Sequence, residues 1–206
     1  MIDGLDDAFR EFLTLEMPIR DNEIEVSFDQ PKREWAARLS RPTINVFLRD
    51  IRENAILRSP QPAIQSSNNG NTATIMRRPV RVDLYYLVTA WATDSVDEHR
   101  MLGRVMSALF RYRAIPDEVV GRHLTGQEAG VSLMLAQYDT QFSPNELWGV
   151  LDNELRPSID IVATVAMNPF AETTVPVVRG LDVTYKQIIG PRSMPGARPE
   201  KQTKKP

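Results

Sequence analysis

Two long stretches in which apolar and polar residues alternate constrain the fold of this chain more than any other feature. They are residues 43–51, TINVFLRDI, and residues 80–92, VRVDLYYLVTAWA. Alternation with a period of two is the pattern of a β-strand that buries one face. The residues between the two stretches carry no helical pattern, so no crossover helix of the kind needed by a parallel pair is expected there. We therefore predict two central, neighbouring strands in an antiparallel or mixed sheet.

Helical patterns flank these strands. Apolar residues at helical spacing predict a first helix that ends before Pro18. The capping boxes Ser95–Glu98 and Ser143–Glu146 predict two more helices, with Pro157 stopping the last one. A helical turn at 31–38 directs Trp35 toward the core, and residues 112–130 are less regular. Further strands are predicted at 23–28, 131–137, 159–167 and, bent or paired, 175–189. The fold class is thus α+β, a mixed and largely antiparallel sheet with helices on one side.

The segment between the two long strands is polar and rich in Pro, Ser and Asn. Its Asn69-Gly70 pair is a strong tight-turn signal because both residues tolerate a positive φ. Residues 63–67 and 72–76 either pair as a protruding hairpin arm or belong to a disordered loop, and the sequence leaves both possibilities open.

Composition divides the chain and excludes several classes of protein. Residues 1–189 are expected to form one domain, whereas residues 190–206, rich in Pro, Gly and Lys, are expected to be a disordered basic tail whose deletion leaves the domain folded. Cysteine is absent, which excludes disulfides and suits a reducing cytoplasm. No signal-peptide pattern occurs, and no apolar run approaches the roughly 20 residues that span a bilayer. With a net charge of −2 the whole molecule has no field that attracts nucleic acid.

No catalytic signature motif occurs. The best metal-binding candidate is the cluster of Asp94, Asp97, Glu98 and His99, although acidic residues at a helix start are more simply explained by capping. Asp152 and Glu154 lie two residues apart and point in different directions, so a salt bridge or cap with Arg156 is favoured over paired acid–base chemistry.

His123 is expected in a solvated loop. We therefore expect a non-enzymatic protein with no cofactor. A small metal-dependent hydrolase or nuclease that uses Asp94, Glu98 and His99 is the alternative.

The arginines are the stronger candidate for function. Arg49, Arg52 and Arg58 leave the first long strand, and Arg77, Arg78 and Arg81 enter the second. If the strands pair, all six gather at the base of the arm. They then form either a solvated rim paired with Asp50, Glu53 and Asp83 or an electropositive patch for an acidic protein partner. Nucleic acid is disfavoured because interleaved exposed aromatic residues are missing. The candidate partner interface comprises Arg52, Arg58, Asn69, Gly70, Arg77, Arg78 and Arg81.

Four separated blocks of the sequence resemble one family. They are RPTINVFLRDIREN at 41–54, RRPVRVDLYYLVTAWA at 77–92, DEHRMLGRVMSALFR at 97–111 and LWGVLDNELRPSIDIVATVAMNPF at 147–170. Together they are similar to the cap, or tail-terminator, proteins of phage-tail-like contractile injection systems, of the antifeeding-prophage and Photorhabdus virulence cassette type. The resemblance covers about residues 1–185.

The resemblance implies a phage tail-terminator-like α+β fold and a homohexameric ring that closes the inner tube and the sheath. Such a protein has sheath and inner-tube subunits as partners and no membrane insertion. It is expected in the cytoplasm, assembled into the particle. The resemblance offers no active-site residues.

Overall fold

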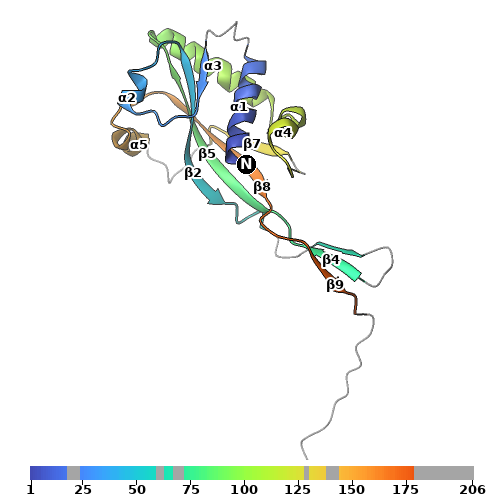
Figure 1. The fold of residues 1–206 in the computed structure, drawn as a ribbon. Helices are drawn as coiled ribbons and strands as arrows, with labels where there is room; N and C mark the ends of the chain where they lie inside the picture. The colour runs from blue at the N-terminus through green and yellow to red at the C-terminus, as the bar shows by residue number, and fades with distance from the viewer. Residues whose placement is uncertain (18–23, 59–62, 67–71, 128–129, 138–143, 179–206) are drawn as a thin grey trace, which may run out of the picture.

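The computed structural model describes residues 1–17, 24–58, 63–66, 72–127, 130–137 and 144–178 (Figure 1). Its centre is a six-stranded sheet in the order β1-β2-β5-β8-β7-β6. The strand bounds are β1 (Glu25–Ser27), β2 (Thr43–Glu53), β5 (Val80–Trp91), β6 (Ala114–Ile115), β7 (Val131–Leu135) and β8 (Ser158–Met167). β1 runs parallel to β2, and every other pair is antiparallel. Val46 lies opposite Val88, so the prediction of two neighbouring central strands is confirmed.

One face of the sheet is covered by three helices, α1 (Ile2–Glu16), α3 (Ser95–Arg111) and α4 (Asp117–His123). The core between them is aliphatic and aromatic, with Phe9 of α1 packed edge-on against Tyr86 of β5 at 5.2 Å between ring centroids. α1 and α4 approach closely at Gly4, where an added Cβ would lie 2.4 Å from the carbonyl oxygen of His123. The main core therefore lies where the apolar residues of the two long strands predict it.

The opposite face is also covered at one end, by α2 (Arg33–Ala36) and α5 (Pro144–Val150). A second core joins these helices to the sheet and contains Trp35, Leu87, Trp91, Trp148 and Leu151. The expectation of helices on one side only is therefore wrong. Thr43 and Asn45, which the alternation places on a polar face, are fully buried beneath this second layer. The inward direction of Trp35 is confirmed, since this side chain is 9% exposed.

Several boundaries differ from the predicted ones. The N-cap of α3 is Asp94, whose carboxylate accepts a hydrogen bond from the backbone N–H of Val96 at 3.1 Å, so the N-cap lies one residue before the predicted Ser95. Glu98 accepts from the Ala92 N–H instead of completing the predicted capping box. α4 lies within the stretch without a clear pattern, and β7 ends before Ala136, whose φ of 47° leaves the extended region. Pro18 lies outside the described residues.

The arm is a separate three-stranded antiparallel sheet of β3 (Ala63–Ser66), β4 (Thr72–Met76) and β9 (Thr173–Pro176). Ser66 pairs with Ala73, which confirms the hairpin rather than the loop. Its strand order, β3-β4-β9, repeats the order β2-β5-β8 of the central strands that lead into it. The third strand begins before the predicted residue 175 and ends at Pro176. Asn69 and Gly70 lie outside the described residues, as do residues 179–206.

Candidate assembly interface

The arm projects from the end of the large sheet at which β2 and β8 end and β5 begins (Figure 1). We call the described residues 54–58, 77–79 and 168–172, which lie between the two sheets, the neck. Pro79 and Pro169 lie in two of its three segments. Because proline cannot donate a backbone hydrogen bond, these two residues favour an interruption of the sheet at the neck.

The two arginines of β2 bind side chains of the body rather than of the arm. The Nε of Arg49 lies 3.0 Å from Oδ1 of Asp160 on β8, and the Arg49 side chain is only 7% exposed. Arg52 pairs with Asp50 at 2.6 Å, and the guanidinium carbons of Arg49 and Arg52 both lie over the ring of Tyr85, at 5.2 and 5.1 Å from its centroid. Arg49 therefore does not lie at the base of the arm, where the sequence predicted it.

Electrostatics support these pairings at the surface. Burial alone would raise the pKa of the Asp50 carboxyl, but hydrogen bonds from Arg52 and the Ile51 backbone outweigh it and lower that pKa. The Nε of Arg58 donates to Oε1 of Glu53 at 2.6 Å, and this hydrogen bond lowers the pKa of Glu53. Asp50 and Glu53 thus pair with Arg52 and Arg58, which is what the solvated-rim interpretation predicts.

Asp83 behaves differently from that interpretation. Its carboxylate is 7% exposed and accepts hydrogen bonds from Thr164 Oγ1 at 2.6 Å and from Asn54 Nδ2 at 3.0 Å. The expected pairing of Asp83 with an arginine is therefore wrong. This carboxylate fastens β5 to β8 and to the neck, which is a structural role.

The arginines that enter β5 remain available at the neck. Arg77 lies over the ring of Phe170, with its guanidinium carbon 5.3 Å from the ring centroid, and thus joins two neck segments. Arg77 and Arg78 are exposed, and Arg81 is half-buried, with its carbonyl accepting from the Asn54 backbone N–H at 2.9 Å. Within the described part of the chain, none of these three side chains has an ion-pair partner. The six arginines therefore do not form one patch, and Arg77 and Arg78 are the exposed neck arginines that lack an ion-pair partner within the described residues, since Arg58 pairs with Glu53.

Three of the four side chains in the metal-binding candidate have partners within the protein, and the fourth, His99, is exposed on α3. Asp94 caps α3, Asp97 pairs with Arg100, and Glu98 accepts from the Ala92 backbone N–H and pairs with Arg156. Among the described residues, no group of three or more His, Asp or Glu side chains could hold a metal ion. The cluster is therefore a network that starts a helix.

Two further expectations for polar residues are wrong. Arg156 pairs with Glu98 rather than with Asp152 or Glu154, because the chain after α5 turns back toward the start of α3. His123 ends α4 instead of lying in a loop, and its Nε2 lies 2.6 Å from Oε2 of Glu11 on α1. Neither arrangement combines a nucleophile with a base.

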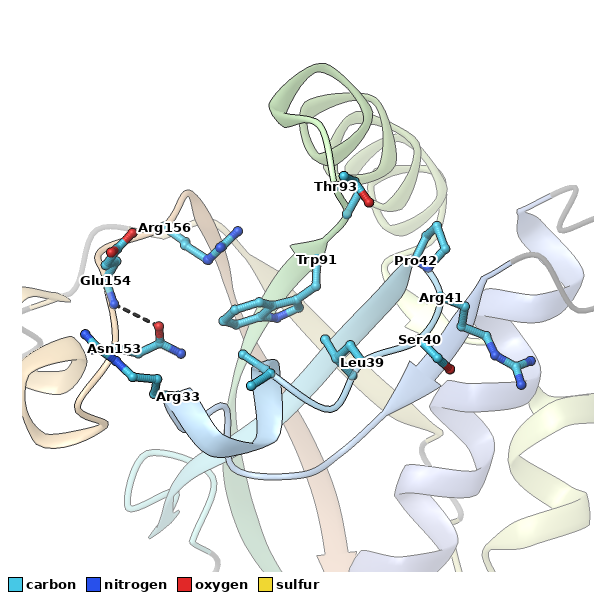
Figure 2. Close-up of a pocket in the computed structure, with 13 residues that line it drawn as sticks. Arg33, Leu39, Ser40, Arg41, Pro42, Trp91, Thr93, Asn153, Glu154 and Arg156 are labelled. Atoms are coloured by element: carbon cyan, nitrogen blue, oxygen red, sulfur yellow. Dashed lines mark hydrogen bonds between the residues drawn. The ribbon is translucent and has the colours of Figure 1, made fainter.

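A pocket that the sequence did not reveal lies between α2, β5 and the turn after α5 (Figure 2). Its volume is about 550 Å³, and Trp91 and Arg156 form part of its wall. The Arg156 guanidinium carbon lies 4.2 Å from the Trp91 ring centroid, and the Glu154 N–H donates to Asn153 Oδ1 at 2.9 Å. Arg156 also pairs with Glu98, so its side chain is held in the wall of the pocket by partners of its own chain.

Comparison with protein families shows to which family the chain belongs. Residues 4–179 match the family described as the Pvc16 N-terminal domain. The chain belongs to this family. The match includes the arm and the neck as well as the body, so all three are parts of the Pvc16 N-terminal domain. A search of curated proteins found no match.

Two solved structures have a similar fold. One is the sheath/tube terminator, in the extended state, of the extracellular contractile injection system PVC, with a TM-score of 0.65, 20% identity and coverage of 91% of this chain and 64% of that one. The other is the tube-terminating cap of the anti-feeding prophage AFP, with a TM-score of 0.62, 20% identity and coverage of 90% and 61%. The chain thus spans less than two thirds of the length of these two proteins. Within its described residues, no helix is long and apolar enough to cross a membrane.

Proposed function

We propose that this chain is a structural, non-enzymatic cap of a contractile injection system. In this proposal a six-fold homomeric ring closes the end of the inner tube and the sheath and fixes the length of the particle. The observation that carries the proposal is the similarity of fold, over about nine tenths of this chain, to proteins described as terminators in two such systems. The ring would assemble in the cytoplasm together with the rest of the particle.

The arm supplies a means of attachment that needs no covalent chemistry. The outer strands of its sheet, β3 and β9, each pair with β4 on one side and with no described strand on the other. An open strand edge can accept an extended segment from another chain through main-chain hydrogen bonds. Arg77 and Arg78 at the neck would fix the register of such a contact by pairing with acidic groups on sheath or tube subunits. We place the rest of the interface at Arg52, Arg58, Arg81, Asn69 and Gly70.

Residues 190–206 are proposed to lie outside the domain of residues 1–189 and to act in partner binding. Their composition cannot bury enough apolar surface to form a core. Deletion of residues 191–206 should therefore leave the melting temperature of the domain unchanged and alter only its binding to the particle.

Electron microscopy of particles from cells that lack this protein tests the proposed function. We expect tubes and sheaths of uncontrolled length with open ends, and a normal length distribution when the full chain is supplied from a plasmid. A matched strain that expresses an unrelated protein from the same plasmid controls for expression. Normal particle length without the protein, or a single off-axis copy of it in a particle map, would contradict the proposal.

A further inference from the structure

The outward face of α3 carries an apolar ridge that no described part of the chain covers. Val96, Met106 and Phe110 lie on this face and are 57%, 41% and 57% exposed. The opposite face of the same helix already contributes Met101, Val105 and Leu109 to the core. A helix that is apolar on two faces fits a position between two packed surfaces, whereas a surface helix needs only one such face.

Arginines run beside this ridge. Arg100, Arg104 and Arg111 line a groove of about 380 Å³ between α3 and the last turn of α1. Arg100 pairs with Asp97 and Arg111 with Glu16, whereas Arg104 has no ion-pair partner within the described residues. Gly103 lies in the same groove, and a Cβ added there would meet nothing within 4 Å, so another backbone could approach closely. We call Val96, Met106, Phe110 and these three arginines the α3 surface.

A second surface has the opposite charge. Val150 at the end of α5 and Leu155 in the following turn are 78% and 61% exposed. Three exposed carboxylates surround them in the sequence, those of Glu146, Asp152 and Glu154. In the described part of the chain none of these carboxylates has an ion-pair partner. We call these five residues the α5 surface.

The two surfaces lie on opposite faces of the central sheet. α3 packs on the face with the main core, and α5 packs on the face with the tryptophan-rich core (Figure 1). A closed ring needs such an arrangement, because each subunit must offer one surface to the next copy and a different surface to the previous copy.

We propose that the α3 surface of one copy binds the α5 surface of the next copy in the ring. Val96, Met106 and Phe110 pack against Val150 and Leu155, and the arginines pair with the carboxylates of the neighbour. The occupant is a second copy of this chain because the α5 surface supplies both the apolar residues and the charge that the α3 surface lacks. This inference rests on the proposed ring, and it specifies which residues join its subunits.

Charge exchange tests the pairing in assembled particles. Arg100→Glu with Arg104→Glu should reduce incorporation of the protein into particles at least tenfold, and Glu146→Arg with Glu154→Arg should do the same. The four substitutions together should restore incorporation, because they recreate the pairs with reversed sign. Circular dichroism and size-exclusion chromatography of each isolated variant verify that it folds. Incorporation that survives either double change, or a quadruple variant no better than the doubles, overturns the inference.

Cysteine crosslinking provides a second and independent measurement, because the natural chain contains no cysteine. A chain with Ser107→Cys and Val150→Cys, treated in particles with a short bismaleimide, should yield a ladder of covalent oligomers that ends at the ring size. Each single variant should yield no ladder, and Ser107→Cys with Thr125→Cys serves as a mismatched pair of exposed positions. A ladder from the mismatched pair, or none from the matched pair, contradicts the contact. Failure with the protein still located at particle ends rejects this interface alone, whereas its absence from particle ends rejects the proposed function.

Discussion

The body and the arm of this protein are both built on antiparallel strands, yet they are stabilised by different means. In the body, helices cover one face of the sheet and one end of the other face, and large side chains such as Trp148 and Tyr86 are fully buried. In the arm, none of the described residues of β4 and β9 belongs to either hydrophobic cluster, and Ala73 is the buried one among them. Changes in the buried cores of the body should therefore alter folding, and changes in the arm should alter assembly.

The largest loss of stability is expected in the second core of the body. Trp148 is 2% exposed and packs near Trp91, with ring centroids 6.3 Å apart. Trp148→Ala removes this contact and leaves a cavity, so the free energy of unfolding should fall by about 3–5 kcal/mol. Denaturation in urea, followed by tryptophan fluorescence and circular dichroism, measures the change.

The matched control lies on the same helix. Val150 is 78% exposed, so Val150→Ala should change the free energy of unfolding by no more than about 0.5 kcal/mol. Equal stability of the Trp148→Ala protein and the wild type would show that the second layer contributes little to the body.

A smaller loss of stability is expected from a change at the start of α3. Glu98 accepts from the Ala92 backbone N–H at 3.2 Å and pairs with Arg156, so its carboxylate joins β5, α3 and the turn after α5. Glu98→Ala should lower the free energy of unfolding by about 1.5–3 kcal/mol, the range for hydrogen bonds to charged groups. Thermal melts should place Glu98→Gln between this variant and the wild type. A hydrolytic activity that disappears with Glu98 while stability is unchanged would instead favour the enzyme alternative.

The free energy of unfolding is expected to depend on pH through Asp6, which lies where α1 meets the sheet. Burial raises the pKa of Asp6, more than the hydrogen bond from the Tyr86 hydroxyl at 3.0 Å lowers it. The folded protein therefore holds this proton more tightly than the unfolded chain. The stabilisation is present below the ordinary pKa of 3.8 and is lost as the pH rises through the raised value.

Asp6→Asn should remove this dependence of the free energy of unfolding on pH, which a series of urea titrations at different pH values would detect. Asp7→Asn, at the exposed neighbouring position, is the control. A curve of stability against pH that Asp6→Asn leaves unchanged would contradict the assignment.

The sequence predicted the body better than its second layer or its surface pairs. Alternation in residues 43–51 and 80–92 was sufficient to pair β2 with β5, because the apolar positions of both strands must face the same core. The same alternation misplaced Thr43 and Asn45, since polar residues can be buried beneath Trp35 and Trp148 when a second layer covers them. That layer comes from two short helices distant in the sequence, which no local pattern connects.

Ion pairs were predicted less well because they depend on contacts distant in the sequence. The pairs Arg52–Asp50 and Arg58–Glu53 join residues close in sequence and agree with one of the two alternatives that the sequence left open, the solvated rim. The pairs Arg49–Asp160 and Arg156–Glu98 cross the sheet or join separate elements, so they follow only from the tertiary structure. The neck arginines follow the same rule, since Arg77 meets Phe170 only because β9 returns beside β4.

The smallest effect on folding, together with a clear effect on assembly, is expected at the neck. Arg77 and Arg78 are exposed and lack ion-pair partners within the described residues, so Arg77→Glu with Arg78→Glu should change the free energy of unfolding by no more than about 0.5 kcal/mol. If these cations meet acidic groups of the particle, charge reversal should give tubes or sheaths of uncontrolled length in electron micrographs. Replacing residues 63–76 by a short turn should have the same result, because it removes β3 and β4 and thus the strand edges of the arm.

A conservative variant separates charge from shape at the same positions. Arg77→Lys with Arg78→Lys keeps both charges but loses the planar guanidinium over Phe170, so we expect length control to be largely retained. Arg104→Glu, a charge reversal on α3, should instead weaken the proposed contact between neighbouring copies, which the cysteine crosslinking measures directly. If both the charge-reversed neck and the shortened arm cap particles normally, the arm is not the attachment. The contacts with tube and sheath must then come from the helices of the body. The body, and not the arm, would attach the protein to the particle.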